Sequence, residues 1–395
     1  MKKILIIGAG FLQTFVIKKA KELGYYVLAV DGNENAVGKE FADEFAHINI
    51  VDKEACLAYA REKKIDGVMT AATDYGVLSA AYIAENLGLP SISMKAAKLI
   101  KNKYKIRKCL FENRVDDSEQ AYEINRETDL KALKDKLVYP VMVKPCDGSG
   151  SRGAARVDSA DELVAAAKNA MAASITGRAE IETFIFGKEY GAESIVIDGE
   201  PYVLSVMQKD MTAPPFYAEL GHAIPCGLYF ENKVRDTVKK ALKALGVNHG
   251  AVNMDMIITN DEKIFIVDIG ARMGGNLIGS HIIPLGTGID YLGALIASAV
   301  GDKADLSQKN PPLAVATKIL ALSPGEVLAL PDFESIEKEL DVKIVHHLSV
   351  GDTITPYRTN LDGCGYIVAA APTVSKAKAK AEKALFLINS TILRK

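Results

Sequence analysis

Apolar runs and helical stretches alternate along the first ninety residues. Short apolar runs predict strands at Ile4–Ile7, Tyr26–Val30, Ile48–Val51 and Gly67–Thr70. Apolar residues at helical spacing predict helices at Phe11–Leu23, Asp52–Lys64 and Tyr75–Asn86. Strands that alternate with helices of this length indicate a doubly wound parallel sheet. Residues 1–93 are therefore expected to form an N-terminal α/β domain.

The pattern changes after residue 93. A lysine-rich helix is expected from Ser93 to Asn113, and strands are expected at 138–143, 179–186, 192–197 and 202–208. A helix at 232–245 precedes two strands, 251–259 and 263–269, which a turn joins. Residues 94–300 are therefore expected to form a core. Residues 301–395, with short strands and a terminal helix at 375–389, are expected to form a smaller C-terminal α+β domain.

Composition narrows the class of protein. The chain has 395 residues, of which 49% are hydrophobic and 25% charged, which suits a globular protein of two or three domains. Lys and Arg number 48 and Asp and Glu 50, so the net charge of −2 argues against a generally basic nucleic-acid binder. The sequence lacks an apolar run long enough for a membrane span, and its five cysteines are scattered. We expect a cytoplasmic protein without a nucleic-acid or membrane partner.

The turn after the first strand resembles a dinucleotide-binding fingerprint. Gly8 and Gly10 follow the strand, and Asp31 closes the second strand. The third glycine of that fingerprint would stand at position 13, where this chain has Gln13. A tight strand-to-helix turn explains the two glycines better than a nicotinamide site does.

The strongest local signal for phosphate binding surrounds Lys144. This lysine ends the apolar strand Val141–Pro145, and a loop rich in glycine and serine follows it. The loop contains Gly148, Ser149, Gly150, Ser151 and Gly153. Backbone amides of such a loop converge on phosphate oxygens. The lysine precedes the glycines, so this is not a Walker A loop. A plain glycine-rich hairpin is the alternative, but it leaves the lysine unexplained.

Two carboxylates on adjacent apolar strands indicate a cation site. Asp255 lies in the first of the two strands joined by a turn, and Asp268 lies at the end of the second. Such carboxylates repel each other unless a cation lies between them, and their hard oxygens suit Mg²⁺. Arg272 follows four residues later, and its planar guanidinium suits a phosphate or a developing oxyanion. Two exposed carboxylates at a sheet edge are the alternative.

These elements, in this order, resemble the ATP-grasp superfamily over nearly the whole chain. The resemblance implies that Lys103 and Lys144 hold ATP phosphates and that the glycine-rich loop closes over them within a mobile lid at about 138–190. It implies that Glu182, Thr183 and Ile185 meet the adenine and Glu189 the ribose. It implies that Asp255 and Asp268 bind Mg²⁺ or Mn²⁺ and that Arg272 steadies an acyl phosphate.

The chain departs from the family pattern at the metal site. The family usually has glutamates at the metal positions and an asparagine two residues after the second. This chain has the shorter Asp255 and Asp268, with Gly270 at the third position. The resemblance then leaves open whether one or two Mg²⁺ ions bind.

The segment Pro214–Pro225 is similar to the corresponding stretch of the L-amino-acid ligase group. That resemblance implies an amino-acid pocket lined by Glu219 and His222, with Arg272, Gly274 and Gly275 beside it. The segments 323–325 and 362–368 resemble the same group.

The resemblance implies an ATP-dependent carboxylate–amine ligase. ATP phosphorylates a small-molecule carboxylate, an amine attacks the acyl phosphate, and ADP and phosphate leave. Two alternatives stay open: an ATP-grasp enzyme that activates bicarbonate or formate, and a nucleotide-binding protein without turnover. A homodimer is compatible with the resemblance, whereas the substrates and the pathway are left undefined.

Overall fold

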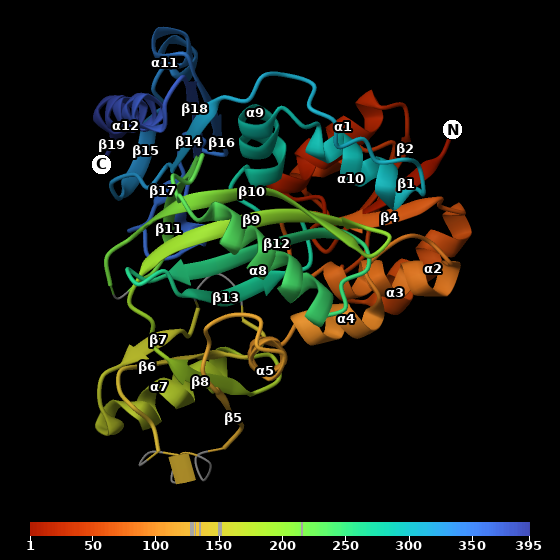
Figure 1. Cartoon of the computed structure of the whole chain (residues 1–395). Helices are drawn as coiled ribbons and strands as arrows, with labels where there is room; N and C mark the ends of the chain where they lie inside the picture. Colours follow the sequence, from red (N-terminus) through yellow and green to blue (C-terminus); the bar gives the residue numbers. More distant parts are fainter. Residues whose placement is uncertain (127–129, 131, 134–135, 149–151, 215) are drawn as a thin grey trace.

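The computed structural model describes residues 1–126, 130, 132–133, 136–148, 152–214 and 216–395. The described residues form four β-sheets with helices packed against them (Figure 1). Among these helices, none combines the length and the apolar character that a bilayer span requires.

The N-terminal strands form a parallel sheet in the order β3-β2-β1-β4. These strands are β1 (Lys3–Ile7), β2 (Tyr26–Asp31), β3 (Glu44–His47) and β4 (Gly67–Thr70). The surrounding helices are η1 (Phe11–Gln13), α1 (Thr14–Glu22), η2 (Val37–Phe41), α2 (Lys53–Lys63) and α3 (Val77–Leu87). Ile4 and Ile6 of β1 join the core cluster that includes α1. Leu5 and Ile7 join the cluster that includes α2 and α3, so both faces of the sheet are covered and the doubly wound prediction is confirmed.

The prediction for the third strand is wrong. The strand is β3, and the apolar run 48–51 that follows it is not a strand. The backbone N–H of Asp52 bonds the carbonyl of Asn49 at 2.9 Å, and the Asp52 side chain caps α2 by accepting from the Ala55 N–H at 3.0 Å. This turn and cap end the extended backbone before the apolar run can pair.

The lysine-rich stretch is two helices, not one. They are α4 (Met94–Ile100) and α5 (Lys103–Glu112). The side chain of Asn102 accepts a hydrogen bond from the Lys105 N–H at 2.9 Å and thereby starts the second helix. Because of this break, Lys103 is the first residue of α5.

An antiparallel sheet of eight strands crosses the middle of the molecule in the order β13-β12-β9-β10-β11-β14-β18-β16 (Figure 1). Its core strands are β9 (Lys188–Ile197), β10 (Glu200–Met211), β11 (Glu219–Ile224), β12 (Gly250–Ile258) and β13 (Ile264–Gly270). The helix α8 (Glu231–Ala244) packs on one face against Met254 and Met256 of β12. Side chains alternate along a strand, so Asp255 points to the opposite face.

A second, smaller sheet lies below the central one in Figure 1 and has the order β5-β8-β6-β7. Its elements are β5 (Tyr122–Ile124), β6 (Val141–Pro145), β7 (Ala155–Val157), α7 (Ala160–Ala173) and β8 (Ala179–Thr183). The helix α7 buries Leu163 and Ala167 against this sheet. The strands β6, β7 and β8 fall within the segment that the sequence predicts as a lid, about 138–190, whereas β5 lies before it.

The C-terminal strands continue the central sheet, because β14 pairs with β11 and β18 with β14. The remaining elements are η3 (Ile278–Ile282), α9 (Ile283–Thr287), α10 (Tyr291–Ala299), β14 (Ala314–Ile319), β15 (Gly325–Ala329), α11 (Phe333–Leu340), β16 (Val342–His346), β17 (Thr353–Ile354), η4 (Asn360–Asp362), β18 (Gly365–Ala371), α12 (Val374–Thr391) and β19 (Leu393–Arg394). The last ninety residues thus contain α11 as well as the expected terminal helix. The N- and C-termini lie on opposite sides of the molecule (Figure 1).

Candidate active site

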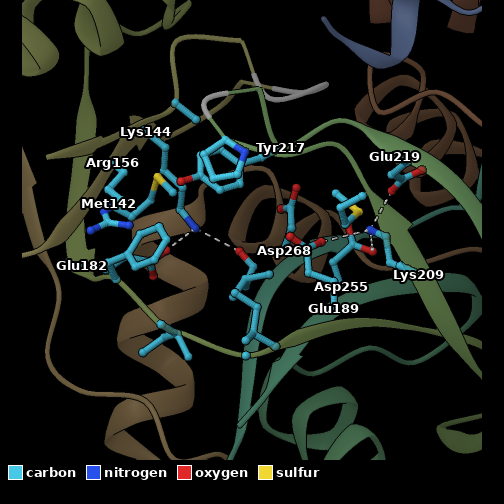
Figure 2. A pocket seen from close by; sticks show the side chains of 18 of the residues that line it. Met142, Lys144, Arg156, Glu182, Glu189, Lys209, Tyr217, Glu219, Asp255 and Asp268 are labelled. Carbon is cyan, nitrogen blue, oxygen red and sulfur yellow. Dashed lines mark hydrogen bonds and ion pairs between the residues drawn. The ribbon is translucent and has the colours of Figure 1, made fainter. Parts of the chain in front are cut away.

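A cavity of 880 Å³ is lined both by strands of the small sheet and by β9 to β13 of the central sheet (Figure 2). Ten residues that the sequence singles out line it: Lys103, Lys144, Gly148, Glu182, Thr183, Ile185, Glu189, Glu219, Asp255 and Asp268. Ser149, Gly150 and Ser151 lie outside the described residues. Five other predicted residues are not among those lining the cavity: Gly153, His222, Arg272, Gly274 and Gly275.

One end of the cavity is apolar. Phe184 and Phe186 meet edge to face with ring centroids 5.0 Å apart, and the Arg156 guanidinium lies 4.9 Å from the centroid of Phe184. Met142 and Ile257 also line the cavity. Aromatic and other apolar side chains at the end of β8 suit a nucleobase.

Lys144 points from β6 into the cavity (Figure 2). Its Nζ lies 2.5 Å from Glu182 Oε1 and donates to the carbonyl of Val267 at 3.0 Å. Burial alone would lower the pKa of Lys144, but the carboxylates of Glu182 and Glu180 hold it above its usual value. Lys144 is therefore a charged donor at the point where the two sheets meet.

Asp255 and Asp268 occupy directly opposed positions on β12 and β13. Lys103 Nζ contacts Asp268, and Lys209 Nζ lies 2.9 Å from Asp255 Oδ1. Burial raises the pKa of Asp255 despite Lys209, whereas Lys103 overcomes burial at Asp268 and lowers its pKa. The oxygens of these two residues suit Mg²⁺, which typically takes one or two carboxylates and completes its shell with phosphates and water. Across the described parts of the chain, no cluster of three His, Cys, Asp or Glu side chains forms a metal site.

Lys209 is a central residue that the sequence analysis missed. Its side chain, 2% exposed, extends from β10 toward three carboxylates (Figure 2). Nζ lies 2.6 Å from Glu219 Oε1 and 3.7 Å from Glu189 Oε2, in addition to its contact with Asp255. A lysine just past the predicted strand 202–208 was the available signal, but the sequence does not show which acids face it.

The charges of Glu189 and Glu219 respond differently to the same lysine. Burial raises the pKa of Glu189 to about 7, and the nearby Asp255 and Glu219 add to that effect. Burial also acts on Glu219, but the close Lys209 ammonium outweighs it and lowers the Glu219 pKa to about 2. Glu219 therefore remains a carboxylate throughout the physiological range.

Glu219 and His222 lie on β11, which the sequence did not predict as a strand. His222 is buried, and its Nε2 lies 3.9 Å from Glu219 Oε2. Burial lowers the pKa of His222 despite the attraction of Glu219, so its imidazole is mostly neutral at pH 7. Asn360 Oδ1 accepts from the Glu219 N–H at 2.9 Å, and the Tyr357 hydroxyl donates to the Glu219 carbonyl.

Arg272 follows β13 and lies beside a separate hollow of 40 Å³, which Lys103 and Asp268 also line. Asp74 of the N-terminal domain pairs with it at 3.1 Å. The N–H of Gly274 donates to the buried Glu193 at 3.1 Å. Gly275 lies next to Leu12, since a β-carbon placed on it would come 3.7 Å from Leu12 Cδ1. The three predicted residues therefore lie where the N-terminal domain meets the core.

Three family models match the chain. An ATP-grasp N-terminal domain matches residues 17–91, an ATP-grasp domain matches 137–280, and L-amino acid ligase C-terminal domain 2 matches 318–392. The chain belongs to the ATP-grasp superfamily. Within this superfamily it resembles the L-amino-acid ligase group, as the C-terminal match indicates.

Curated proteins resemble the chain over different lengths. The formate-dependent phosphoribosylglycinamide formyltransferase of Hydrogenovibrio crunogenus is 28% identical over 67% of this chain and 67% of its own length. The aligned segment spans 55% and 47% of the lengths of two further curated relatives. It thus covers only about half of each.

Solved ATP-grasp structures share the whole architecture. Phosphoribosylglycinamide synthetase from Anaerococcus prevotii has a TM-score of 0.79 at 25% identity, covering 100% of both chains. L-amino acid ligase from Bacillus licheniformis has a TM-score of 0.85 at 23% identity, covering 100% of this chain and 99% of its own. At the latter identity the likeness shows the ATP-grasp fold alone.

Proposed function

We propose that the protein is an ATP-dependent ligase that joins an amino acid to an amine through an acyl phosphate and releases ADP and phosphate. One observation carries this proposal. Glu219 lines the same cavity as Lys144 and Asp255, and its backbone is bonded by Tyr357 and Asn360. Both of these partners lie in the segment matched by the L-amino acid ligase C-terminal domain.

ATP would lie with its adenine at the apolar end of the cavity and its phosphates at the charged end. Thr183 and Ile185 border the adenine end, whereas Lys103, Lys144 and Gly148 border the phosphate end. The Lys144 contact with Glu182 would loosen as phosphate oxygens provide new partners. Closure of the lid, about 138–190, would exclude water from the acyl phosphate.

Asp255 and Asp268 would hold Mg²⁺, with Mn²⁺ as an alternative. The ion supplies charge neutralisation at the phosphates when it is bound. Its arrival would free Lys103 from Asp268 and Lys209 from Asp255, since each carboxylate would gain a stronger cation. Both lysines would then be available to phosphate or to substrate.

The chemistry follows from the poor reactivity of a carboxylate. Its oxygen attacks the terminal phosphorus of ATP, and the bond to the ADP oxygen breaks. The amine then attacks the acyl carbon, phosphate leaves with the bonding electrons, and the amine loses a proton. The protein contributes positioning and charge, with Lys144 holding phosphate oxygens and Arg272 the acyl phosphate.

Glu219 would receive the ammonium group of the amino acid. Its low pKa keeps it ionised, and its position in the cavity suits a cationic group. In the free protein, the Lys209 ammonium lies 2.6 Å from Glu219 Oε1. The substrate ammonium carries the same charge, so it would take the place of Lys209 beside this carboxylate. His222 would support Glu219 as a neutral hydrogen-bonding group.

Activation of formate or bicarbonate is the second candidate function. A formate-dependent enzyme is among the relatives, at 28% identity. Such a substrate has no ammonium group, so this function would leave Glu219 without its proposed role. The two candidates therefore predict different effects of the same substitution.

Phosphate release with ATP and Mg²⁺ tests the proposal. Amino acids, singly and in pairs, should stimulate release, whereas formate and bicarbonate should not. Glu219→Gln should raise half-saturation for the amino acid by about tenfold and leave that for ATP within about twofold, because the lost charge is remote from the nucleotide. His222→Ala should act in the same direction more weakly. Stimulation by formate or bicarbonate alone would favour the second candidate.

A further inference from the structure

A loop of the N-terminal domain reaches Arg272. This loop follows β4, and it carries Asp74 to within 3.1 Å (Oδ1 to Nε) and 3.2 Å (Oδ2 to Nη2) of the guanidinium. Both side chains are mostly buried, at 24% and 17% exposed. The pair joins residues 198 positions apart and connects two domains at the edge of the candidate active site.

The backbones of the two loops are also connected. Ala71 forms a β-bridge with Met273, and the Ala72 N–H donates to the Met273 carbonyl at 3.1 Å. On the other side, Glu193 accepts from the Gly274 N–H. The loop that carries Arg272 is therefore fixed at its backbone, and Asp74 acts on the free end of the side chain.

Gly270 makes room for this pair. A β-carbon at position 270 would lie 2.9 Å from Arg272 Cζ and 3.0 Å from Asp74 Oδ1. Any side chain there would push the guanidinium away from the carboxylate. The guanidinium ends a long flexible side chain, so it can move without disturbing the fold.

We propose that Asp74 is a positioning residue that orients Arg272 for the reacting phosphoryl group and limits its hold on the product phosphate. This proposal rests on the proposed function in one respect, namely that Arg272 contacts a phosphoryl group. Asp74 accepts a hydrogen bond from Nη2 at 3.2 Å and lies 3.1 Å from Nε, which itself donates no hydrogen bond to the described residues. Within the described parts of the chain, Nη1 makes only a long contact of 3.5 Å with the Met273 carbonyl and is therefore the donor for an incoming oxygen. The carboxylate also repels a bound anion, so phosphate leaves more readily than it would from an unpaired arginine.

Two variants and one matched control test this role. Asp74→Asn keeps the shape and removes the charge, whereas Gly270→Ala keeps the charge and displaces the guanidinium. Asp43→Asn is the control, because Asp43 is also in the N-terminal domain, is 25% exposed and pairs with Lys21 at 2.8 Å, outside the residues that line the cavity. The Arg272 Nη2–H signal in NMR spectra is assigned by its loss in Arg272→Lys.

The first readout is the exchange of the Arg272 Nη2–H with water in the ligand-free protein, because Nη2 donates the hydrogen bond to Asp74. Exchange should be slow in the wild type and in Asp43→Asn. It should be about tenfold faster in Asp74→Asn, which removes the charge that strengthens the hydrogen bond, and in Gly270→Ala, which displaces the guanidinium. Unchanged exchange in the two variants would overturn the proposal.

The second readout is the affinity for inorganic phosphate in the presence of MgADP, measured by calorimetry. Asp74→Asn should bind phosphate about tenfold more tightly, because the competing carboxylate charge is gone. A variant that had merely lost structure would bind more weakly. Unchanged or weaker binding by Asp74→Asn would therefore overturn the proposal. Neither readout needs an amino-acid substrate, so failure to find a substrate pair does not affect the test.

Discussion

Lys209 illustrates how one buried cation stabilises a cavity built from acids. Glu189, Glu219 and Asp255 all contact its ammonium group within 3.7 Å. Without a metal or a substrate, these three carboxylates have Lys209 as a shared counter-charge. Lys209 therefore stabilises the folded state of the free protein, and it remains part of the site when ligands bind.

Replacing this lysine should destabilise the free protein strongly. Lys209→Met leaves three acids without their shared partner, and the loss of one member of a buried ion pair costs about 3–5 kcal/mol. Urea unfolding measures this difference in the free energy of unfolding. MgADP should reduce the loss, because the ion would neutralise Asp255.

Lys383→Met serves as the control for that experiment. Lys383 is 57% exposed and pairs with Glu339 on the surface, so its removal should change the free energy of unfolding by less than about 0.5 kcal/mol. Equal losses in the two variants, or no effect of MgADP on Lys209→Met, would contradict the role given to Lys209.

Glu180 is a buried acid of a different kind. It is fully buried in β8, neither carboxylate oxygen has a hydrogen-bond partner among the described residues, and Lys144 Nζ lies 4.0 Å away. Burial, with the charge of Glu182 adding to it, raises the Glu180 pKa to about 7. The folded protein thus binds a proton here more tightly than the unfolded chain, whose usual value is 4.5.

The raised pKa of Glu180 makes the free energy of unfolding fall as the pH rises. Between pH 4.5 and 7 the folded state holds more protons at Glu180, so this residue lowers stability progressively as the pH rises. Glu180→Gln should be more stable than the wild type by about 3 kcal/mol at pH 8 and by less than about 1 kcal/mol at pH 5. Urea unfolding at the two pH values checks this. A difference that is the same at both would argue against a raised pKa.

At the scale of single residues, the sequence identifies those functional residues whose type contrasts with that of their neighbours. Lys144 ends an apolar strand, and Asp255 and Asp268 interrupt two others, so all three stand out before folding is known. Asp74 and Lys209 do not stand out, because their partners are distant in sequence. Their roles arise from pairings that only the folded chain contains.

Among the elements, the loop before β18 has the clearest influence on the site. Asp362 accepts from the backbone of Thr359 at 2.7 Å and from its hydroxyl at 2.9 Å, which closes a capping box. This compact turn carries Asn360 and, just before it, Tyr357. Both bond the backbone of Glu219, so the loop fixes the start of β11.

Weakening this loop should change the use of the amino acid and not of ATP. Tyr357→Phe and Asn360→Ala each remove one hydrogen bond, worth about 1 kcal/mol, so half-saturation for the amino acid should rise about fivefold. Half-saturation for ATP should stay within about twofold. Phosphate release at varied concentrations of each substrate measures both values.

Asn389→Ala is the matched control for Asn360→Ala. Asn389 Oδ1 likewise accepts from a distant backbone N–H, that of Ser323 at 3.0 Å, and it is not among the residues lining the cavity. Its replacement should leave both half-saturation values unchanged. Equal effects of the two asparagine variants would indicate general destabilisation of the C-terminal region.

The sequence predicted some elements better than others for a physical reason. Apolar runs buried on both faces, such as β1, are visible directly. The strand β11 was not predicted, since its sequence Glu-Leu-Gly-His-Ala-Ile mixes polar and apolar residues. It pairs with the nearby β10 on one side, but its partner on the other side, β14, begins ninety residues further on. Gly221 also weakens the strand signal, because glycine is uncommon in strands. The structure requires a glycine there, since a β-carbon would lie 2.0 Å from the Thr317 carbonyl oxygen.

At the scale of the whole molecule, the central sheet unites two predicted domains. The predicted boundary at residue 301 separates β11 from β14, yet Ala223 pairs with Ala316 and Ile224 with Val315. The C-terminal strands therefore complete the sheet that carries Glu219. The sequence around the predicted boundary does not reveal this continuity, because the paired residues lie more than ninety positions apart.

A chain that ends at residue 312 should not form a soluble protein. It would expose the edge of β11 and the apolar residues Ile224 and Ile283, which pack against Val315 in the intact core cluster. A chain that ends at residue 391, which lacks only the short strand β19 and its flanks, should remain soluble. Sedimentation of the two purified chains compares them. A soluble, folded 1–312 chain would show that the sheet does not require its C-terminal strands.

Synthesis on the ribosome gives this shared sheet a temporal consequence. The residues of β11 leave the ribosome about 90 residues before their partners in β14. At ordinary elongation rates, the open edge persists for about 5–20 s in every nascent chain. During that interval it can pair with another chain on the same messenger. Synonymous codons that slow translation between residues 225 and 313 should therefore lower the soluble yield of an unchanged protein.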